Sequence, residues 1–403
     1  MVVGLDCMTG LQTARTLARH GVPVIGLAGN RRHYACRTRV CEQILTADVK
    51  GDGFIVELER LGPSLGQRAV LFPCTDLSVL LISLHRKRLE SWYHVLLPGH
   101  DVVVQMMDKL SFLIYAQANG LAVPVTMVIE KRADAELAAE SLVFPCVIKP
   151  PIKSAGWQAR TSAKVFQVSD PDHLLEVYDR VAGWADVLIA QEWVEGGEDQ
   201  LFSCNGYFDA ASRPLVTFVA RKLRQWPPHT GTSCLGEECH NDVVLAETVR
   251  LFHGVGFHGL AYLEMKRDVR TGRHFIIEPN VGRPTGRSAI AEGGGVELLY
   301  AAYCDAVGLP LPENIVQRYI GTKWIDIRRD MQSALYFMRR GELTPRRWAK
   351  SLSGPLTHAV LSRRDPLPFL VDLLHSLRKA ADQSVARLRA ALGGAQGSNS
   401  QPT

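Results

Sequence analysis

Short apolar runs alternate with amphipathic stretches over the first hundred residues. The apolar runs predict strands at residues 2–5, 22–27, 43–46, 69–73 and 94–98. Between them, apolar residues recur at helical spacing over residues 11–20, 54–61 and 77–89. Strand–helix–strand units of this length favour a parallel sheet with helices on both faces, so we predict an α/β domain here.

The middle of the chain differs, because its predicted strands follow one another with fewer helices between them. The strands are expected at residues 123–129, 144–149, 164–168, 187–194, 200–208 and 214–223. Helices are expected at residues 108–119, with Asp108 as N-cap, and at 170–182 and 242–254. Residues 260–266 and 274–280 have the pattern of a hairpin that turns at Thr271 and Gly272. This part therefore predicts α+β organisation with antiparallel sheets.

The last part of the chain is basic and mostly helical in pattern. Residues 311–392 contain 15 Lys and Arg against seven Asp and Glu, although the whole chain of 403 residues has a net charge of only +5. Residues 393–403 are rich in Gly, Ser, Gln and Asn and are expected to be disordered. We therefore expect four parts, at residues 1–106, 107–310 (divided near 190), 311–392 and 393–403.

Composition excludes several classes of protein. Hydrophobic residues make up 46% and charged residues 22%, so a disordered, collagen-like or disulfide-framework chain is excluded. No apolar run approaches the ~20 residues of a membrane-spanning helix, and the first residues lack the basic segment of a signal peptide. The nine cysteines form no Cys-x-x-Cys pair, which favours free thiols and a cytoplasmic protein.

The strongest chemical signal lies in the predicted hairpin. Side chains alternate along a strand, so Glu278 and Asn280 project from one face about 7 Å apart, and Glu264 on the neighbouring strand can point to the same side. Two carboxylates and an amide oxygen suit Mg²⁺, which completes its octahedron with substrate phosphate oxygens. The alternative is that these are polar positions on the solvent face of a hairpin.

A second signal is Lys149, which ends the predicted strand 144–149. Its ammonium is placed just beyond the sheet, where it can meet a phosphate as a point charge. The alternative is a lysine whose stem packs along the strand while its head reaches water. The following loop, 151–156, contains a single glycine and is a weak phosphate-binding loop.

A third signal is the segment 190–199, which combines an apolar strand end, an acidic cluster and two glycines. Its carboxylates could accept hydrogen bonds from an adenine amino group and from ribose hydroxyls. An acidic surface turn is the commoner origin of such a run.

In their order and spacing, these motifs resemble the ATP-grasp superfamily over residues 1–310, most closely its carboxylate–amine ligase and carbamoyl-phosphate-synthase-like branch. Residues 1–106, with Gly4 and Gly10 but without G-x-G-x-x-G, resemble the Rossmann-like domain that precedes ATP-grasp modules. Residues 107–310 resemble the two-subdomain ATP-grasp domain itself. The resemblance implies a ligase that uses ATP and Mg²⁺, or Mn²⁺, to join a carboxylate to an amine through an acyl phosphate.

The resemblance also implies which residues hold the nucleotide. Lys109 and Lys149 correspond to the two lysines that contact ATP phosphates. Glu198 corresponds to the acidic residue near ribose, with Glu195 and Asp199 as alternatives. The hinge that holds adenine corresponds to Glu192, Trp193 and Val194, with the backbone of Trp193 and Val194 pairing to the base.

Further correspondences concern the transferred phosphate. Lys222 and Arg283 correspond to basic residues near the γ-phosphate or the acyl substrate. The usual pattern has an arginine two positions after the asparagine, where this chain has Gly282, so the arginine comes one residue later. The magnesium ligands correspond to Glu264, Glu278 and Asn280.

Several alternatives stay open at this point. The same fold could activate bicarbonate or carbamate in a carboxylase-like reaction, or it could be a degenerate ATP-binding module without ligase activity. Residues 224–231 are expected to form a mobile loop, in which Arg224 grips a substrate carboxylate, or a plain surface loop. We expect small-molecule substrates and no nucleic acid; the basic C-terminal helices could make weak contact with anionic lipid, or present a solvated face.

Overall fold

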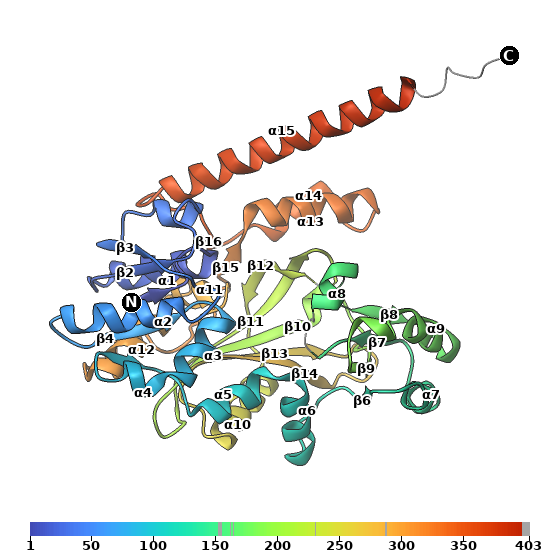
Figure 1. Ribbon diagram of the computed structural model, residues 1–403, viewed down its shortest axis with the longest axis horizontal. Coiled ribbons are helices and arrows are strands. Elements are labelled where there is room, and N and C mark those ends of the chain that lie inside the picture. Colours follow the sequence, from blue (N-terminus) through green and yellow to red (C-terminus); the bar gives the residue numbers. More distant parts are fainter. Residues whose placement is uncertain (152–154, 162, 164, 230, 287, 397–403) are drawn as a thin grey trace.

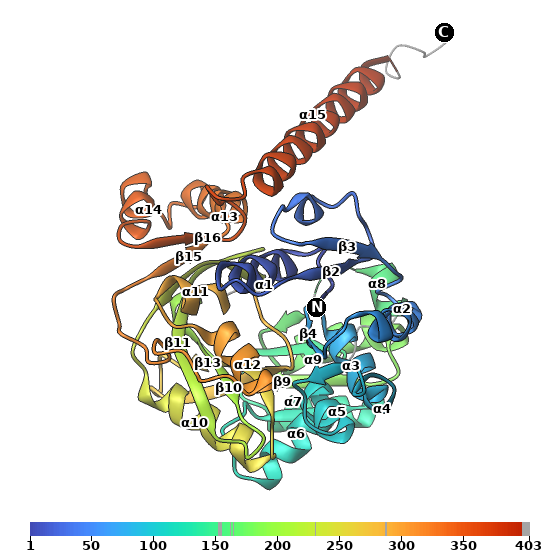
Figure 2. The same cartoon turned by 90° about the vertical axis from the view of Figure 1, so that its left-hand side faces the viewer.

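The computed structural model describes residues 1–151, 155–161, 163, 165–229, 231–286 and 288–396. Within them the chain forms a five-stranded, a four-stranded and a seven-stranded sheet. Figure 1 shows the seven-stranded sheet between the N-terminal sheet and the four-stranded sheet. Figure 2 shows the same arrangement from the side of the N-terminal sheet.

The N-terminal sheet is parallel throughout, with strand order β3-β2-β1-β4-β5. Its strands are β1 (Val2–Val3), β2 (Ile25–Ala28), β3 (Gln43–Thr46), β4 (Ala69–Pro73) and β5 (Tyr93–Val95). The neighbours Val2 and Val3 enter two different buried clusters, so both faces of the sheet are covered. The predicted parallel α/β sheet is confirmed.

Helices connect and cover these strands. The predicted helix 77–89 is in fact two helices that meet at His85. The helices of this part are α1 (Met8–Arg19), α2 (Gly53–Leu61), α3 (Asp76–Leu84), α4 (Arg86–Leu89) and α5 (His100–Met107), with 3₁₀ turns η1 (Tyr34–Arg37) and η2 (Gly62–Ser64).

The four-stranded sheet is antiparallel, with order β6-β9-β7-β8. The strands are β6 (Thr126–Ile129), β7 (Cys146–Lys149), β8 (Phe166–Val168) and β9 (Leu188–Glu192). Its helices are α6 (Lys109–Ala118), which leads into it, α7 (Arg132–Ser141), α8 (Ala155–Arg160) and α9 (Pro171–Val181), followed by η3 (Ala182–Trp184). The Asp108 carboxylate accepts from the Ser111 N–H at 2.8 Å, so the predicted cap of α6 is confirmed.

The seven-stranded sheet has the order β14-β13-β10-β11-β12-β15-β16, and only its last pair is parallel. The strands are β10 (Leu201–Phe208), β11 (Pro214–Trp226), β12 (Thr232–Glu238), β13 (Gly259–Arg267), β14 (His274–Val281), β15 (Lys323–Ile325) and β16 (Leu356–His358). Its helices are α10 (Asp242–Gly254), α11 (Ser288–Gly293) and α12 (Leu298–Val307), and η4 (Glu198–Gln200) precedes it. The predicted hairpin is the antiparallel pair β13–β14.

The predicted loop at residues 224–231 is present only after Trp226. Strand β11 continues to Trp226, and β12 begins at Thr232 and pairs with it. Cross-strand pairing holds residues 224–226, so Arg224 lies on a strand, and the described residues 227–229 and 231 belong to the turn that follows.

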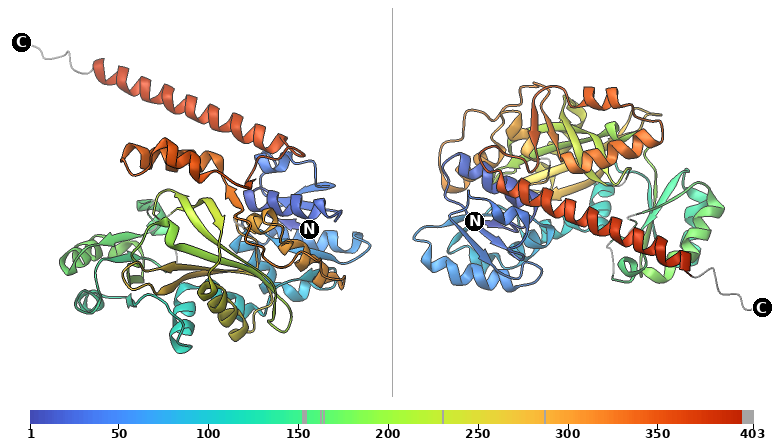
Figure 3. Two further views of the ribbon diagram at one scale, coloured as in Figure 1. Left: turned by 180° about the vertical axis from the view of Figure 1, so that it is seen from behind. Right: turned by 90° about the horizontal axis from the view of Figure 1, so that it is seen from above.

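The basic C-terminal part also differs from its predicted, mostly helical form, because β15 and β16 extend the central sheet. Its helices are α13 (Ile327–Arg339), α14 (Pro345–Ser351) and α15 (Leu367–Gln396). Figure 3 shows α15 projecting from the body beside the N-terminal part. It continues four residues into the predicted disordered tail, whose residues 397–403 lie outside the described residues. Among the described residues, no helix has the length and apolarity that crossing a bilayer would require.

Candidate active site

A cavity of about 650 Å³ lies between the four-stranded and seven-stranded sheets, and side chains from both line it. Residues from α1 and α13 also reach its wall. All the predicted site residues except Glu198 line this cavity, namely Lys109, Lys149, Glu192, Trp193, Val194, Lys222, Glu264, Glu278, Asn280 and Arg283. The fold thus brings together groups that are up to 174 positions apart in the chain.

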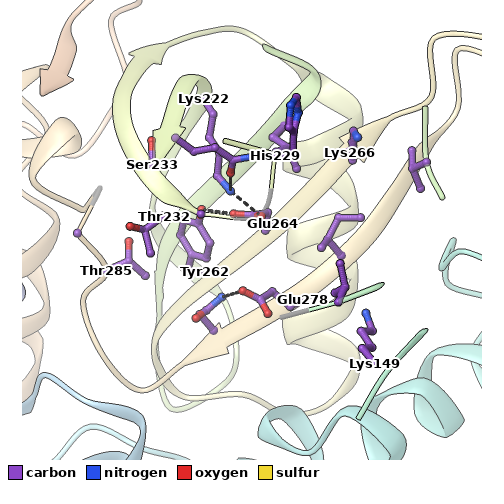
Figure 4. Close-up of a pocket in the computed structure, with 18 of the residues that line it drawn as sticks. Lys149, Lys222, His229, Thr232, Ser233, Tyr262, Glu264, Lys266, Glu278 and Thr285 are labelled. Atoms are coloured by element: carbon purple, nitrogen blue, oxygen red, sulfur yellow. Dashed lines mark hydrogen bonds and ion pairs between the residues drawn. The ribbon is translucent and has the colours of Figure 1, made fainter. Parts of the chain in front are cut away.

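The three predicted metal ligands lie on one side of the β13–β14 pair. Glu264 and Glu278 are direct cross-strand partners, and Asn280 pairs with Tyr262 two residues away. The Asn280 Nδ2 lies 3.4 Å from the Glu278 Oε1, so these side chains point toward one another (Figure 4). The alternative of scattered polar positions on a solvent face does not fit this convergence.

The oxygen ligands in the cavity suit Mg²⁺ better than a metal ion that is coordinated by protein side chains alone. Among the described residues, no three His, Cys, Asp or Glu side chains come together as a metal site. The cavity offers two carboxylates and an amide oxygen, and Mg²⁺ commonly takes one or two carboxylates and completes its shell with water and phosphate oxygens. The residues present therefore fit a Mg²⁺ ion that arrives with a phosphate-bearing substrate.

Lys222 neutralises one of these carboxylates. Its Nζ lies 2.9 Å from the Glu264 Oε1, and both residues are buried. The Tyr262 hydroxyl donates to the other Glu264 oxygen at 3.2 Å. Because an unpaired buried charge is costly, this pairing stabilises the Glu264 side chain and orients it.

Two lysines lie at the small-sheet side of the cavity. The Lys149 Nζ donates to the Gln191 Oε1 at 2.8 Å, and the Gln191 Nε2 donates to the Thr126 hydroxyl at 2.8 Å. Burial, followed by the neighbouring Lys109 ammonium, lowers the pKa of Lys149 to about 8, against an opposing effect of Glu278. Two ammonium groups held this close form a site for an anion.

The predicted adenine hinge is only partly available. The Trp193 N–H donates to the Pro145 carbonyl at 2.9 Å, so the predicted pairing of the Trp193 backbone with a base would use its carbonyl. The Glu192 carboxylate accepts from the Val143 N–H at 2.9 Å. Among the described residues, the Val194 N–H has no backbone acceptor, which leaves it as the hinge donor. Lys266 lies over the Trp193 ring at 4.5 Å and closes this end of the cavity.

Glu198 does not line the cavity, contrary to its predicted place near ribose. Its carboxylate accepts from the Gln225 N–H at 2.8 Å and the His229 N–H at 2.9 Å, and burial raises its pKa. Among the described lining residues, neither of the alternatives, Glu195 and Asp199, is present. Glu198 therefore fixes the turn between β11 and β12, which places His229 in the wall.

Arg283 connects the metal-ligand side chains to the N-terminal part. Its Nη2 donates to the Asn280 Oδ1 at 2.9 Å, and its Nε lies 2.6 Å from an Asp76 oxygen of α3. Gly282 before it has a φ of +72°, and an added Cβ would overlap the side chains of Leu97 and Val79. Close packing there requires glycine, which explains why the arginine comes one position later.

Arg224 does not face the cavity, contrary to its predicted role as a substrate grip. It is buried, and its guanidinium pairs with Asp330 of α13 at 2.7 and 3.1 Å. The arginine that α13 does present to the cavity is Arg329, whose Nη1 donates to the Thr232 hydroxyl at 3.0 Å.

Sequence reasoning missed several other lining residues. Lys266 and Tyr262 lie two positions on either side of Glu264, so the period-two alternation that selected Glu264 also indicated them. Arg329 and Trp324 come from the basic C-terminal part, where no sequence motif indicated that they would line the cavity. That part therefore completes the cavity wall.

Comparisons with known proteins agree with this architecture. No protein-family model matches the chain. The chain is 21% identical over 234 residues to a D-aspartate ligase of Enterococcus faecium, covering 55% of each protein. It is 27% identical over 197 residues to a D-alanine–D-alanine ligase of Xylella fastidiosa, covering 45% of this chain and 60% of the relative. The chain thus spans less than two thirds of the length of these curated relatives.

Solved structures share the fold at low identity. A biotin carboxylase of Campylobacter jejuni superposes with a TM-score of 0.64 and 12% identity, covering 79% of this chain and 73% of that one. An ADP complex of an N5-carboxyaminoimidazole ribonucleotide synthetase superposes with a TM-score of 0.63 and 12% identity, covering 84% of each chain. These structures show that the chain has the fold that the resemblance to the ATP-grasp superfamily predicted.

Proposed function

We propose that this protein is an ATP-dependent ligase that joins a carboxylate to an amine and releases ADP and phosphate. The observation that carries the proposal is the convergence of Glu264, Glu278 and Asn280 in one cavity with Lys149 and Lys109. The relatives named as D-aspartate and D-alanine ligases support an amino acid as one substrate.

The nucleotide would lie along the cavity between the two sheets. Its base would meet the Val194 N–H beside Trp193, and its phosphates would meet the ammonium groups of Lys149 and Lys109. Glu264, Glu278 and Asn280 would hold Mg²⁺, or Mn²⁺, which when bound supplies positive charge to phosphate oxygens.

The chemistry needs positioning and electrostatics more than a protein nucleophile. A substrate carboxylate oxygen attacks the γ-phosphorus, the bond from that phosphorus to the ADP oxygen breaks, and ADP leaves. The amine then attacks the acyl carbon of the acyl phosphate, the carbon–oxygen bond to phosphate breaks, and the ammonium product loses a proton to solvent. Lys222 adds positive charge near the transferred group, beside Glu264.

The acyl substrate would occupy the end of the cavity away from Lys149. Figure 4 shows Thr232, Ser233 and Thr285 on that side of the two glutamates. Arg283 and Arg329 line the cavity and carry guanidinium groups suited to a carboxylate. These roles extend the predicted role of Arg283 and replace that of Arg224.

A bicarbonate-activating reaction is the second candidate, because structural neighbours include biotin carboxylases. One experiment separates it from ligation: ADP release is measured with single amino acids and amino-acid pairs, D-aspartate and D-alanine among them, with and without magnesium. Ligation predicts magnesium-dependent release that needs both a carboxylate and an amine. Release with bicarbonate alone would favour the second candidate, and binding of ATP with no release under any condition would indicate a degenerate module.

We also propose the division into residues 1–106, 107–310, 311–392 and 393–403, and a cytoplasmic location. The separate five-stranded and four-stranded sheets support the boundaries near residues 106 and 190, whereas β15 and β16 join residues 311–392 to the central sheet. The nine cysteines, all free thiols, support a reducing compartment.

A further inference from the structure

A second cavity, of about 630 Å³, lies where α1, α11 and β16 meet the segment 359–365. Its volume falls in the range of roughly 300–1,000 Å³ that is usual for small-molecule sites. None of the described residues that line it also lines the first cavity. It is therefore a separate space, and its chemistry has no role in the proposed ligation.

Basic side chains dominate the wall of this cavity. Arg19, Arg363 and Arg364 line it, and none of the three makes an ion pair with another described residue. The fourth arginine, Arg15, is occupied, because its Nε lies 2.9 Å from an Asp365 oxygen and its Nη1 donates to the Val360 carbonyl at 2.7 Å. Arg15 thus fixes the segment that carries Arg363 and Arg364, and leaves these two free to meet an anion.

Two buried polar atoms in the same wall lack partners. Gln12 is only 7% exposed, and its Nε2 donates to the Ala359 carbonyl at 3.2 Å, but its Oε1 has no partner among the described residues. The Nδ1 of His358 also has none within that part of the chain. Both atoms are enclosed by protein, so the arginines rather than these atoms face an occupant of the cavity.

The two acidic residues of the cavity do not cancel this basic character. Asp365 is held by Arg15 and by the Thr38 hydroxyl, which donates at 2.6 Å. Glu292 accepts from the Leu299 N–H at 3.0 Å, and burial raises its pKa to about 7. A raised pKa favours the neutral carboxyl, which reduces its repulsion of an anion.

We propose that this second cavity binds a small organic anion whose phosphate or carboxylate group meets Arg19, Arg363 and Arg364. Guanidinium groups bind both kinds of anion in bidentate fashion, so this charge is what the site recognises.

The test is calorimetric binding of AMP, L-aspartate and inorganic phosphate, each to the full chain, which separates phosphate from carboxylate recognition. At least one probe is expected to bind, and the double variant Arg363→Ala/Arg364→Ala is expected to lose about tenfold or more in affinity, since charge-assisted pairs are the strong ones. The matched control is Arg346→Ala/Arg347→Ala on α14, which removes the same charge from exposed positions outside the cavity. The control is expected to bind as the unchanged protein does.

A third variant distinguishes the two cavities. Lys149→Ala alters only the first cavity, so a probe bound in the second cavity keeps its affinity in this variant. Absence of binding by all three probes would overturn the proposal. So would equal losses in the two double arginine variants, or a loss confined to Lys149→Ala. A failed ligase assay would leave these binding results unaffected.

Discussion

At the scale of single residues, Lys149 combines burial with a proposed phosphate-binding role. Its pKa of about 8 means that the ammonium form prevails at neutral pH and is lost as the pH rises. Phosphates favour the charged form, so the KM for ATP is expected to rise above pH 8, by up to about tenfold per pH unit. Steady-state kinetics between pH 7 and about 10 measures this.

The variant Lys149→Arg serves as the control for this pH dependence. Arginine stays charged over the whole range, so the rise in KM above pH 8 should disappear even if the absolute KM changes. A flat KM in the unchanged protein would contradict the assigned role of Lys149.

Arg224 supports a second prediction at this scale. A structural role and a substrate-binding role of this residue predict different effects of its replacement. Arg224→Ala leaves Asp330 buried without its cation and is expected to lower the free energy of unfolding by about 3–5 kcal/mol. Denaturant unfolding measures this loss, and Arg221→Ala, which breaks a half-exposed pair with Glu237, should cost under about 1 kcal/mol. Unchanged stability with a raised KM for the carboxylate would restore the substrate-grip interpretation.

The residue scale also shows what the sequence could predict of the site. Alternation along two strands was sufficient to place Glu264, Glu278 and Asn280 together, because a strand's period is fixed. The partners of Trp193 and Glu198 come from other segments, at Pro145 and at the β11–β12 turn. No local pattern contains those partners, so the roles of these two residues could not be predicted.

At the scale of elements, Gly282 directly follows β14 and packs against the N-terminal part of the chain. Gly282→Ala would combine a strained positive φ with overlap against Leu97 and Val79. Gly308→Ala is the matched control, since Gly308 has a φ of +71° but open space around it. We expect a loss of about 1 kcal/mol for the control and about 2–4 kcal/mol for Gly282→Ala, measured by denaturant unfolding. Equal losses would show that the packing contact contributes nothing.

Element prediction succeeded where the hydrophobic period was long and failed where tertiary contacts decided the structure. The parallel N-terminal sheet and the β13–β14 hairpin follow from local patterns. Strand β12 was missed because Thr232–Glu238 is polar and lies after Pro227-Pro228, yet it is paired on both sides, by β11 and β15. Strand β15 has only three residues and lies in a part of the chain whose pattern predicted helices, so it was not predicted.

At the scale of the whole molecule, α15 presents an apolar stripe beside basic residues. Leu370, Leu373, Leu374 and Leu377 are 43–58% exposed, and Arg378 and Lys379 follow them. If the helix makes the expected weak contact with anionic lipid, the protein will sediment with anionic vesicles at low salt, less so at high salt, and not with neutral vesicles. Absence from the anionic vesicle pellet at low salt would favour the solvated-face alternative.

The fold brings the walls of the cavity together from two sheets, α1 and the C-terminal part, and the proposed function depends on the oxygen ligands of β13 and β14. The central measurement is ADP release as magnesium is titrated, with an active carboxylate and amine, for the unchanged protein, Glu278→Gln and the exposed control Glu313→Gln. Glu278→Gln is expected to lower the rate at least about 100-fold at every magnesium concentration, because loss of a metal ligand removes several kcal/mol of stabilisation, while the control keeps its rate. Full turnover in a correctly folded Glu278→Gln protein would contradict the account.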